Sequence, residues 1–249
     1  MSAVPKRAMV LAAGLGKRMR PLTDVIPKPM VEVAGQALID HVLDRFAAIE
    51  VRDIVVNLHH LGHKLEAHLS TRCDMRITLS PESELLETGG GVTKALPLLG
   101  REAFFAANAD VLWYDGATPA LARLSAMWDE AKMDALLLLQ RTVTAHGYEG
   151  QGDYFLDPLG RAKRRRGQAV APYVFAGVQI LHPRLFKDAP QGAFSLNRLY
   201  DRAEEAERLF GVAHDGLWFH VGTPDSIAAT EAELDYVPPA RGERRTAAS

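Results

Sequence analysis

The sequence contains a single cysteine, Cys73, among 249 residues. One thiol excludes an internal disulfide and a zinc site built from several thiolates. Basic and acidic residues number 29 and 31, and the resulting net charge of -2 gives no sign of a nucleic-acid partner. No apolar run approaches the roughly 18 residues of a membrane-spanning helix, and residues 8–13 are too short a stretch for a secretory signal. We therefore expect a cytoplasmic enzyme with no membrane partner.

Hydrophobic residues make up 47% of the chain and charged residues 24%, proportions that are ordinary for a globular protein with one large domain. Short β-rich runs alternate with segments of helical spacing, as in residues 39–49 and 121–127. This alternation predicts a Rossmann-like α/β fold with a mainly parallel sheet and helices on both faces. The strands expected in this part are residues 8–13, 54–57, 76–80, 103–108 and 135–140.

The second half of the chain predicts a different arrangement. Two short strands flank the turn sequence DPLG, which favours a β-hairpin. No linker or internal repeat separates the halves, so residues 1–237 are expected to form one domain, with residues 238–249 as a flexible tail. The expected elements are a hairpin at 154–165, strands at 174–181 and 217–221, and helices at 195–209, capped by Ser195, and 223–234.

The stretch MVLAAGLGKRMRPLTDVIPKP, residues 9–29, is typical of a loop that binds phosphate. Gly14 and Gly16 allow positive φ and a close approach of the backbone to a ligand. Arg18 and Arg20 add cations for phosphate oxygens, and Lys28 is held between two prolines. The loop lacks the third glycine of a dinucleotide fingerprint and the Ser or Thr of a Walker loop. Any metal must therefore be held by another part of the chain.

Four stretches, in order along the chain, resemble the sugar-1-phosphate nucleotidyltransferases, or NDP-sugar pyrophosphorylases. They are LAAGLGKRMRPLT…PKPM near the N-terminus, LLETGGGVTKAL at 85–96, FFAANADVL at 104–112 and LWFHVGTPDS at 217–226. The resemblance implies a GT-A-like fold, with a nucleotide-binding part at about residues 8–140 and a smaller sugar-binding lid at residues 141–237. It also implies transfer of a nucleotidyl group from a nucleoside triphosphate to a sugar 1-phosphate, with release of pyrophosphate.

Within the family, the short chain and the ETGGG and VGTP elements are most similar to members that use UTP and N-acetylmuramate 1-phosphate in peptidoglycan recycling. Mannose-1-phosphate guanylyltransferases are a near neighbour and provide an alternative pair of substrates. The expected partners are therefore UTP and a sugar 1-phosphate, and the chain is expected to be a monomer or a small homo-oligomer.

The resemblance further implies roles for individual residues. The attacking phosphate monoester has a second pKa of about 6, so no general base is needed and catalysis depends on positioning and charge. Arg18 would stabilise the leaving pyrophosphate, and Lys28 would bridge the α-phosphate and the sugar phosphate. The glycines of ETGGG would either leave room for the base or form a flexible turn. The implied nucleotide-binding residues are Leu11, Ala13, Gly14, Gly16, Lys17, Glu87, Gly89 and Gly90, and the implied sugar-binding residues are Asn108, Asp153 and Gly177.

The metal site is where the sequence departs from the family. Asp110 is the expected Mg²⁺ ligand, because a carboxylate suits this hard cation. His220 stands where relatives carry a second metal-binding aspartate. It either orients water or phosphate while Asp110 is the sole carboxylate, or it binds the metal and shifts the preference towards Mn²⁺. A third hypothesis is that the site is impaired and the chain acts as a sensor of nucleotide sugars.

Two further stretches are interpreted as structural. The run RAKRRR at residues 161–166 lacks interleaved aromatic residues, which favours a solvated hairpin over a nucleic-acid site. His59, His60 and His63 have no spacing that defines a metal site, and they are assigned to a surface loop.

Overall fold

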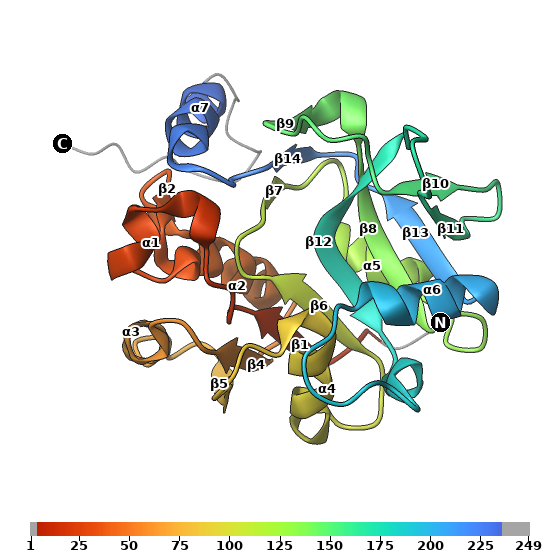
Figure 1. Ribbon diagram of the computed structural model, residues 1–249, viewed down its shortest axis with the longest axis horizontal. Helices are drawn as coiled ribbons and strands as arrows, with labels where there is room; N and C mark the ends of the chain where they lie inside the picture. The colour runs from red at the N-terminus through yellow and green to blue at the C-terminus, as the bar shows by residue number, and fades with distance from the viewer. Residues whose placement is uncertain (1–3, 236–249) are drawn as a thin grey trace.

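The computed structural model describes residues 4–235, and its centre is a nine-stranded sheet (Figure 1). One half of this sheet is parallel throughout, with β1 in the middle. Its strands, in spatial order, are β6 (Phe104–Asn108), β1 (Arg7–Leu11), β4 (Asp53–Leu58) and β5 (Arg76–Pro81). All four were expected from the sequence. The tail predicted at residues 238–249 lies outside the described residues.

The second half of the chain extends the same sheet through β12 (Tyr173–Leu181), which is antiparallel to β6 and to β8 (Ala135–Arg141). The predicted hairpin is formed by β10 (Tyr154–Leu156) and β11 (Ala162–Arg164). β13 (Leu209–Ala213) pairs in parallel with β8. The two halves therefore share one continuous sheet.

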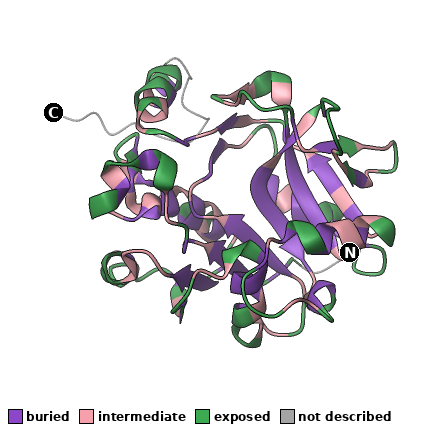
Figure 2. Cartoon of the chain, viewed as in Figure 1, coloured by how far each residue is buried: buried purple, intermediate pink, exposed green. Residues whose placement is uncertain are grey.

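Helices cover both faces of the sheet, as predicted, because successive strand residues point to opposite sides. On β1, Ala8 and Val10 pack with α2 (Leu38–Ala48), α3 (Gly62–Leu69) and α5 (Ala120–Met127). Met9, between them, packs on the opposite side with α4 (Glu87–Leu99) and α6 (Asn197–Glu205). Figure 2 shows the buried strands lying between these helical layers. The α/β fold class is confirmed.

A smaller three-stranded sheet lies beside the end of β6 and consists of β7 (Leu112–Tyr114), β14 (Leu217–Phe219) and β9 (Ala145–His146). After β14 the chain forms α7 (Pro224–Asp235), which packs near β2 (Glu32–Val33) (Figure 1). Glu231 accepts a hydrogen bond from the backbone N–H of Ala34 at 2.9 Å, which ties α7 to the N-terminal half. The remaining short elements are β3 (Gln36–Ala37), α1 (Leu22–Val25) and the 3₁₀ turns Lys17–Met19, Lys28–Met30, Thr142–Thr144 and Pro183–Phe186.

The helix predicted at residues 195–209 is shorter in the structure, and β13 was missed. α6 ends at Glu205, and Glu207 adopts a positive φ of 56°. Leu209 and the residues after it are apolar and pair with the buried strand β8, so tertiary pairing decides their conformation. Ser195 lies one residue before the N-cap position, which Leu196 occupies.

The three histidines do not share one surface loop as predicted. His63 lies in α3, and the rings of His59 and His60 lie within hydrogen-bonding distance of the carbonyl oxygens of Glu82 and Thr23. The arginine run makes its contacts with α6. Arg164 forms two hydrogen bonds with the carboxylate of Asp201 at 2.7 and 2.6 Å, and Arg166 pairs with Asp201 and Glu204. The arginine run thus fastens the hairpin to α6. Among residues 4–235, no helix is both long and apolar enough to cross a membrane.

Candidate functional site

A cavity of about 530 Å³ opens at the carboxyl ends of β1, β4 and β6, the edge where ligands of parallel sheets bind. Ten residues predicted from the sequence to bind substrate or metal contribute to its wall. They are Leu11, Ala13, Gly14, Gly16, Lys17, Arg18, Lys28, Glu87, Asn108 and Asp110. These residues come from four separate segments of the chain, so the fold brings together what the motifs predicted.

The loop after β1 owes its shape to Gly16. This residue has a φ of 60°, and a Cβ placed on it would lie 2.8 Å from a methyl carbon of Thr23 and 3.0 Å from Cβ of Lys28. The Thr23 hydroxyl donates to the Gly16 carbonyl at 2.9 Å, which fixes the turn. Gly14 does not have the positive φ that was predicted for it. Its Cβ direction is open, with no atom within 4 Å, so its small size leaves space in the cavity.

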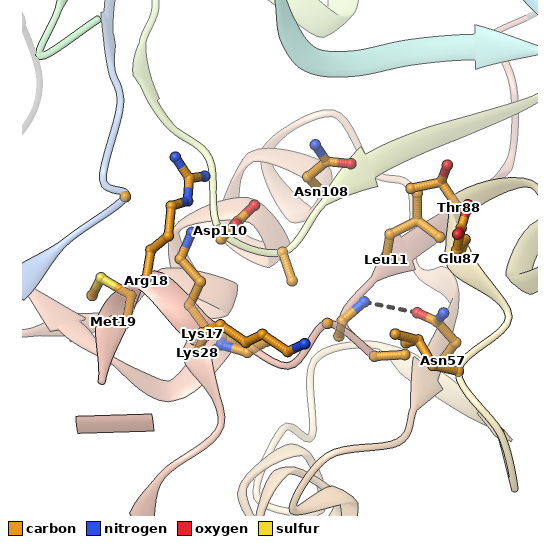
Figure 3. A pocket seen from close by; sticks show the side chains of 18 of the residues that line it. Leu11, Lys17, Arg18, Met19, Lys28, Asn57, Glu87, Thr88, Asn108 and Asp110 are labelled. Carbon is orange, nitrogen blue, oxygen red and sulfur yellow. Dashed lines mark hydrogen bonds and ion pairs between the residues drawn. The ribbon is translucent and has the colours of Figure 1, made fainter. Parts of the chain in front are cut away.

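One end of the cavity carries cations next to a carboxylate (Figure 3). Lys28 Nζ lies 2.5 Å from Asp110 Oδ2, and the side chains are 13% and 35% exposed. Arg18 projects into the same end from the 3₁₀ turn Lys17–Met19. Arg20, predicted as a second phosphate-binding arginine, does not line the cavity. Arg20 follows Arg18 by two residues and so lies on the outer side of the turn, where it is exposed and pairs with Asp24.

His220 lies close to this cationic end, although its side chain does not line the cavity. Its ring is half-buried beside Trp218 and edge-on to Tyr148. Burial lowers the pKa of His220, and the cations of Arg18 and Lys28 lower it further, while Asp110 acts in the opposite direction. The imidazole is therefore neutral at pH 7. Among the described residues there is no group of three or more His, Cys, Asp and Glu side chains arranged to hold a metal.

The opposite end of the cavity is formed by Leu11, Asn57, Glu87 and Thr88 (Figure 3). Glu87 has a φ of 57°, a conformation that favours glycine. A non-glycine residue held there costs roughly 1–3 kcal/mol, and such strain is concentrated at functional sites. Glu87 is exposed and lies at this end, on the opposite side of the view from Arg18 and Lys28.

The prediction that Gly89 and Gly90 face the nucleotide is not supported by their surroundings. Both are buried in the first turns of α4, behind the cavity wall. A Cβ on Gly89 would lie 2.3 Å from the ring of Phe194, and one on Gly90 would lie 2.3 Å from the carbonyl oxygen of Gly192. Both N–H groups donate to the carbonyl of Phe194, at 2.8 and 3.2 Å. Because Gly89 and Gly90 have no side chains, residues 192–194 can pack against the start of α4.

Replacing Gly90 with alanine is expected to destabilise the protein. Alanine is favoured over glycine within a helix by up to about 1 kcal/mol, but overpacking against a backbone oxygen costs about 1–3 kcal/mol. We expect a net loss of about 1–2 kcal/mol, measured by urea denaturation. Gly14→Ala is the control, because its Cβ would meet open space. Equal stability of Gly90→Ala and the wild type would contradict the packing role.

The remaining sugar-site predictions, Asp153 and Gly177, are not among the residues that line the cavity. Asp153 accepts a hydrogen bond from the backbone N–H of Phe175 at 2.9 Å and so fastens β10 to β12. Gly177 is buried with a φ of 79°, and its Cβ direction meets Val111 at 2.3 Å and the Asn108 amide at 3.2 Å. Gly177 thus gives the cavity residue Asn108 the space it occupies, whereas Asp153 stabilises the sheet.

Two residues of the cavity, Asn57 and Ser195, were not predicted from the sequence to lie there. Thr88 and Gly222 lie in the predicted ETGGG and VGTP elements, although neither was assigned a role of its own. Asn57 had a usable signal, since it stands near the carboxyl end of an expected parallel strand. Gly222 belongs to the stretch LWFHVGTPDS, which the resemblance placed near the metal site. Ser195 lies more than a hundred residues from the first motif, and nothing local in the sequence indicates that it meets this motif.

Comparisons with known proteins agree with this geometry. A family model described as nucleotidyl transferase matches residues 7–149. The N-acetylmuramate alpha-1-phosphate uridylyltransferase of Caulobacter vibrioides is 46% identical over 239 residues, covering 94% of this chain and 99% of that protein. The enzyme of the same name from Neisseria meningitidis serogroup B is 35% identical over 230 residues, covering 91% and 97%. A mannose-1-phosphate guanyltransferase of Hypocrea jecorina is more distant, with 26% identity over 90% of this chain and 63% of that protein.

Solved structures share the fold. The inositol-1-phosphate CTP transferase from T. maritima superposes with a TM-score of 0.76 and 17% identity, covering 94% of this chain and 96% of the other. A UDP-glucose pyrophosphorylase complexed with UDP-glucose gives a TM-score of 0.74 at 15% identity, covering 93% and 99%.

Proposed function

Because the chain belongs to the nucleotidyl transferase family, as a sugar-1-phosphate nucleotidyltransferase, we propose that it transfers a uridylyl group from UTP to N-acetylmuramate 1-phosphate. The products are UDP-N-acetylmuramate and pyrophosphate. The observation that carries the proposal is the 46% identity over nearly the full length of a relative with that name. The cavity supports it, because its cations and its loop suit a triphosphate.

The two ends of the cavity suggest how the nucleotide lies. The phosphates occupy the end with Lys17, Arg18 and Lys28, where backbone N–H groups and cations converge on anions. The base and ribose occupy the end with Glu87, Thr88 and Leu11. The sugar 1-phosphate enters beside Asn108, with residues 141–237 supplying the rest of its site.

The reaction requires little proton transfer. An oxygen of the sugar 1-phosphate attacks the α-phosphorus of UTP, the bond to the bridging oxygen of the β-phosphate breaks, and pyrophosphate leaves with that electron pair. Lys28 would hold the α-phosphate and the incoming phosphate together, overcoming their repulsion. Arg18 would bind the departing pyrophosphate through two hydrogen bonds. These contacts contribute most where charge moves in the transition state.

The residues at the phosphate end of the cavity fit a divalent cation of the kind that this family generally uses. Mg²⁺ is typically bound by one or two carboxylates together with substrate phosphates and waters, and Asp110 supplies one carboxylate at the phosphate end. When bound, the cation would neutralise charge on the phosphates. Lys28 occupies one oxygen of Asp110, so the ammonium group would turn towards the α-phosphate as substrate and cation bind. We propose that His220 acts as a neutral neighbour of this site and does not bind the cation.

Replacing His220 with asparagine tests its role. If Asp110 alone supplies the protein ligand, the ratio of Mg²⁺-supported to Mn²⁺-supported turnover should stay within about threefold of the wild type, since imidazole nitrogen favours Mn²⁺ over Mg²⁺. Steady-state rates with each cation give this ratio. A variant that loses a preference for Mn²⁺ shown by the wild type would identify His220 as a metal ligand.

The substrates are tested by pyrophosphate release from a matrix of triphosphates and sugar 1-phosphates. UTP with N-acetylmuramate 1-phosphate should give the highest kcat/KM. A maximum for GTP with mannose 1-phosphate would favour the guanylyltransferase alternative. Tight nucleotide binding without turnover of any pair would favour the sensor hypothesis.

A further inference from the structure

A buried polar bridge lies beneath the base end of the cavity. Asn57 on β4 and Glu82 after β5 are 2% and 6% exposed. Asn57 Nδ2 donates to Glu82 Oε1 at 2.7 Å. At one end of the bridge, Asn57 Oδ1 accepts from the backbone N–H of Ala12 at 2.7 Å (Figure 3). At the other end, Glu82 Oε2 accepts from the backbone N–H of Leu86 at 3.0 Å.

The two backbone groups that the bridge joins belong to different walls of the cavity. Ala12 lies in the loop after β1, next to Leu11 and Ala13, and Leu86 leads directly into Glu87 and Thr88. The bridge therefore fixes the separation between these walls.

The neighbouring helix is built around the bridge. A Cβ on Gly91 of α4 would lie 2.9 Å from both Asn57 Nδ2 and Glu82 Oε1, so only glycine lets the helix pack this closely. Buried polar groups held on every side in this way are rigid, and leaving one of them without a partner is costly.

We propose that Asn57 and Glu82 are positioning residues that set the width of the base-binding end and thereby the preference for one base over another. This inference rests on the proposed function. The pair acts through the backbone at Ala12 and Leu86, and neither residue takes part in the chemical step. A wall separation fixed for a pyrimidine disfavours the larger purine ring.

The donor and acceptor pattern provides a sharp test. Glu82 accepts two hydrogen bonds, and a glutamine there has one acceptor and one donor group. Because the N–H groups of Ala12 and Leu86 are fixed donors, no rotation of either amide satisfies Glu82→Gln. We expect the Kd for UTP, measured by calorimetry without sugar phosphate, to rise about tenfold. The ratio of the Kd for GTP to the Kd for UTP should fall about threefold or more.

The double variant that combines Asn57→Asp with Glu82→Gln restores the pattern. The introduced aspartate carboxylate would accept from Ala12 and from the new glutamine amide, whose oxygen would accept from Leu86. The double variant keeps the net charge of the wild type, and residue 57 is only 2% exposed, so the GTP-to-UTP ratio reports the geometry of the walls. We expect this ratio to return to within about twofold of wild type, a coupling between the two sites. Glu84→Gln, an exposed change in the same loop, is the matched control and should leave the ratio unchanged.

Each outcome decides a separate point. If Glu82→Gln has a lower melting temperature but the wild-type Kd values and ratio, the bridge is only structural and the inference is wrong. If the double variant is no closer to wild type than the single variant, the hydrogen-bond pattern is not the cause. If the wild-type protein does not prefer UTP, it is the proposed function that fails.

Discussion

Replacing Lys28 with alanine should lower kcat by about a hundredfold to a thousandfold, the range seen when one preorganised charge-stabilising group is removed. The Lys28 ammonium is largely buried at the cationic end of the cavity, 2.5 Å from Asp110. It is therefore held close to the proposed position of the two phosphates, which repel each other, and only has to turn from Asp110 towards them. Asp110, left without this partner, is about a third exposed and can be hydrated, so the loss of stability should stay near 1 kcal/mol.

The measurement is steady-state pyrophosphate release, normalised to folded protein by circular dichroism. Lys28→Arg provides a second variant, because it keeps the charge but replaces a compact ammonium by a planar group. Lys132→Ala is the control, since Lys132 pairs with Asp129 at the surface outside the cavity. A Lys28→Ala enzyme with wild-type kcat would remove Lys28 from the mechanism.

Arg18→Ala should lower kcat about a hundredfold, because Arg18 is the cation placed to bind the leaving pyrophosphate. The side chain is exposed at the cavity and contributes little to stability. Its role is expressed in the transition state, so kcat should fall more than KM for UTP rises.

Arg20→Ala is the matched control for this prediction. Arg20 lies two residues further along, has a side chain 59% exposed and pairs with Asp24 outside the cavity. It should keep wild-type kinetics. Equal losses in the two variants would show that general positive charge in the loop, and not the placement of Arg18, supports the reaction.

Much of the site could be predicted because it depends on short stretches. Gly16, Arg18 and Lys28 lie in one motif. Asp110 follows the buried strand β6, and because β6 pairs in parallel with β1, its end lies beside the loop after β1. The expected strands on both sides of β1 place these groups at one edge of a parallel sheet. Composition, alternation and the motif therefore determine the fold class and the phosphate end of the cavity.

The features that could not be predicted from the sequence depend on contacts between distant segments of the chain. Gly89 and Gly90 are small because residues 192–194 pack on them, and a local pattern cannot distinguish this from space for a base. The strand β13 continues an apparently helical sequence, and only pairing with β8 makes it extended. The Asn57–Glu82 bridge joins three segments through side-chain hydrogen bonds. Nothing in the residues near Asn57 predicts its partner.

In the proposed reaction, this cavity holds UTP while N-acetylmuramate 1-phosphate attacks its α-phosphorus. The most direct measurement uses UTP labelled at the α-phosphorus, with the sugar 1-phosphate, Mg²⁺ and either wild-type or Lys28→Ala protein. We expect the label to appear in UDP-N-acetylmuramate and unlabelled pyrophosphate to be released in equal amount. Both products should be nearly lost in Lys28→Ala. Label in UMP, or no labelled product while another triphosphate and sugar 1-phosphate are converted, would contradict the proposed reaction.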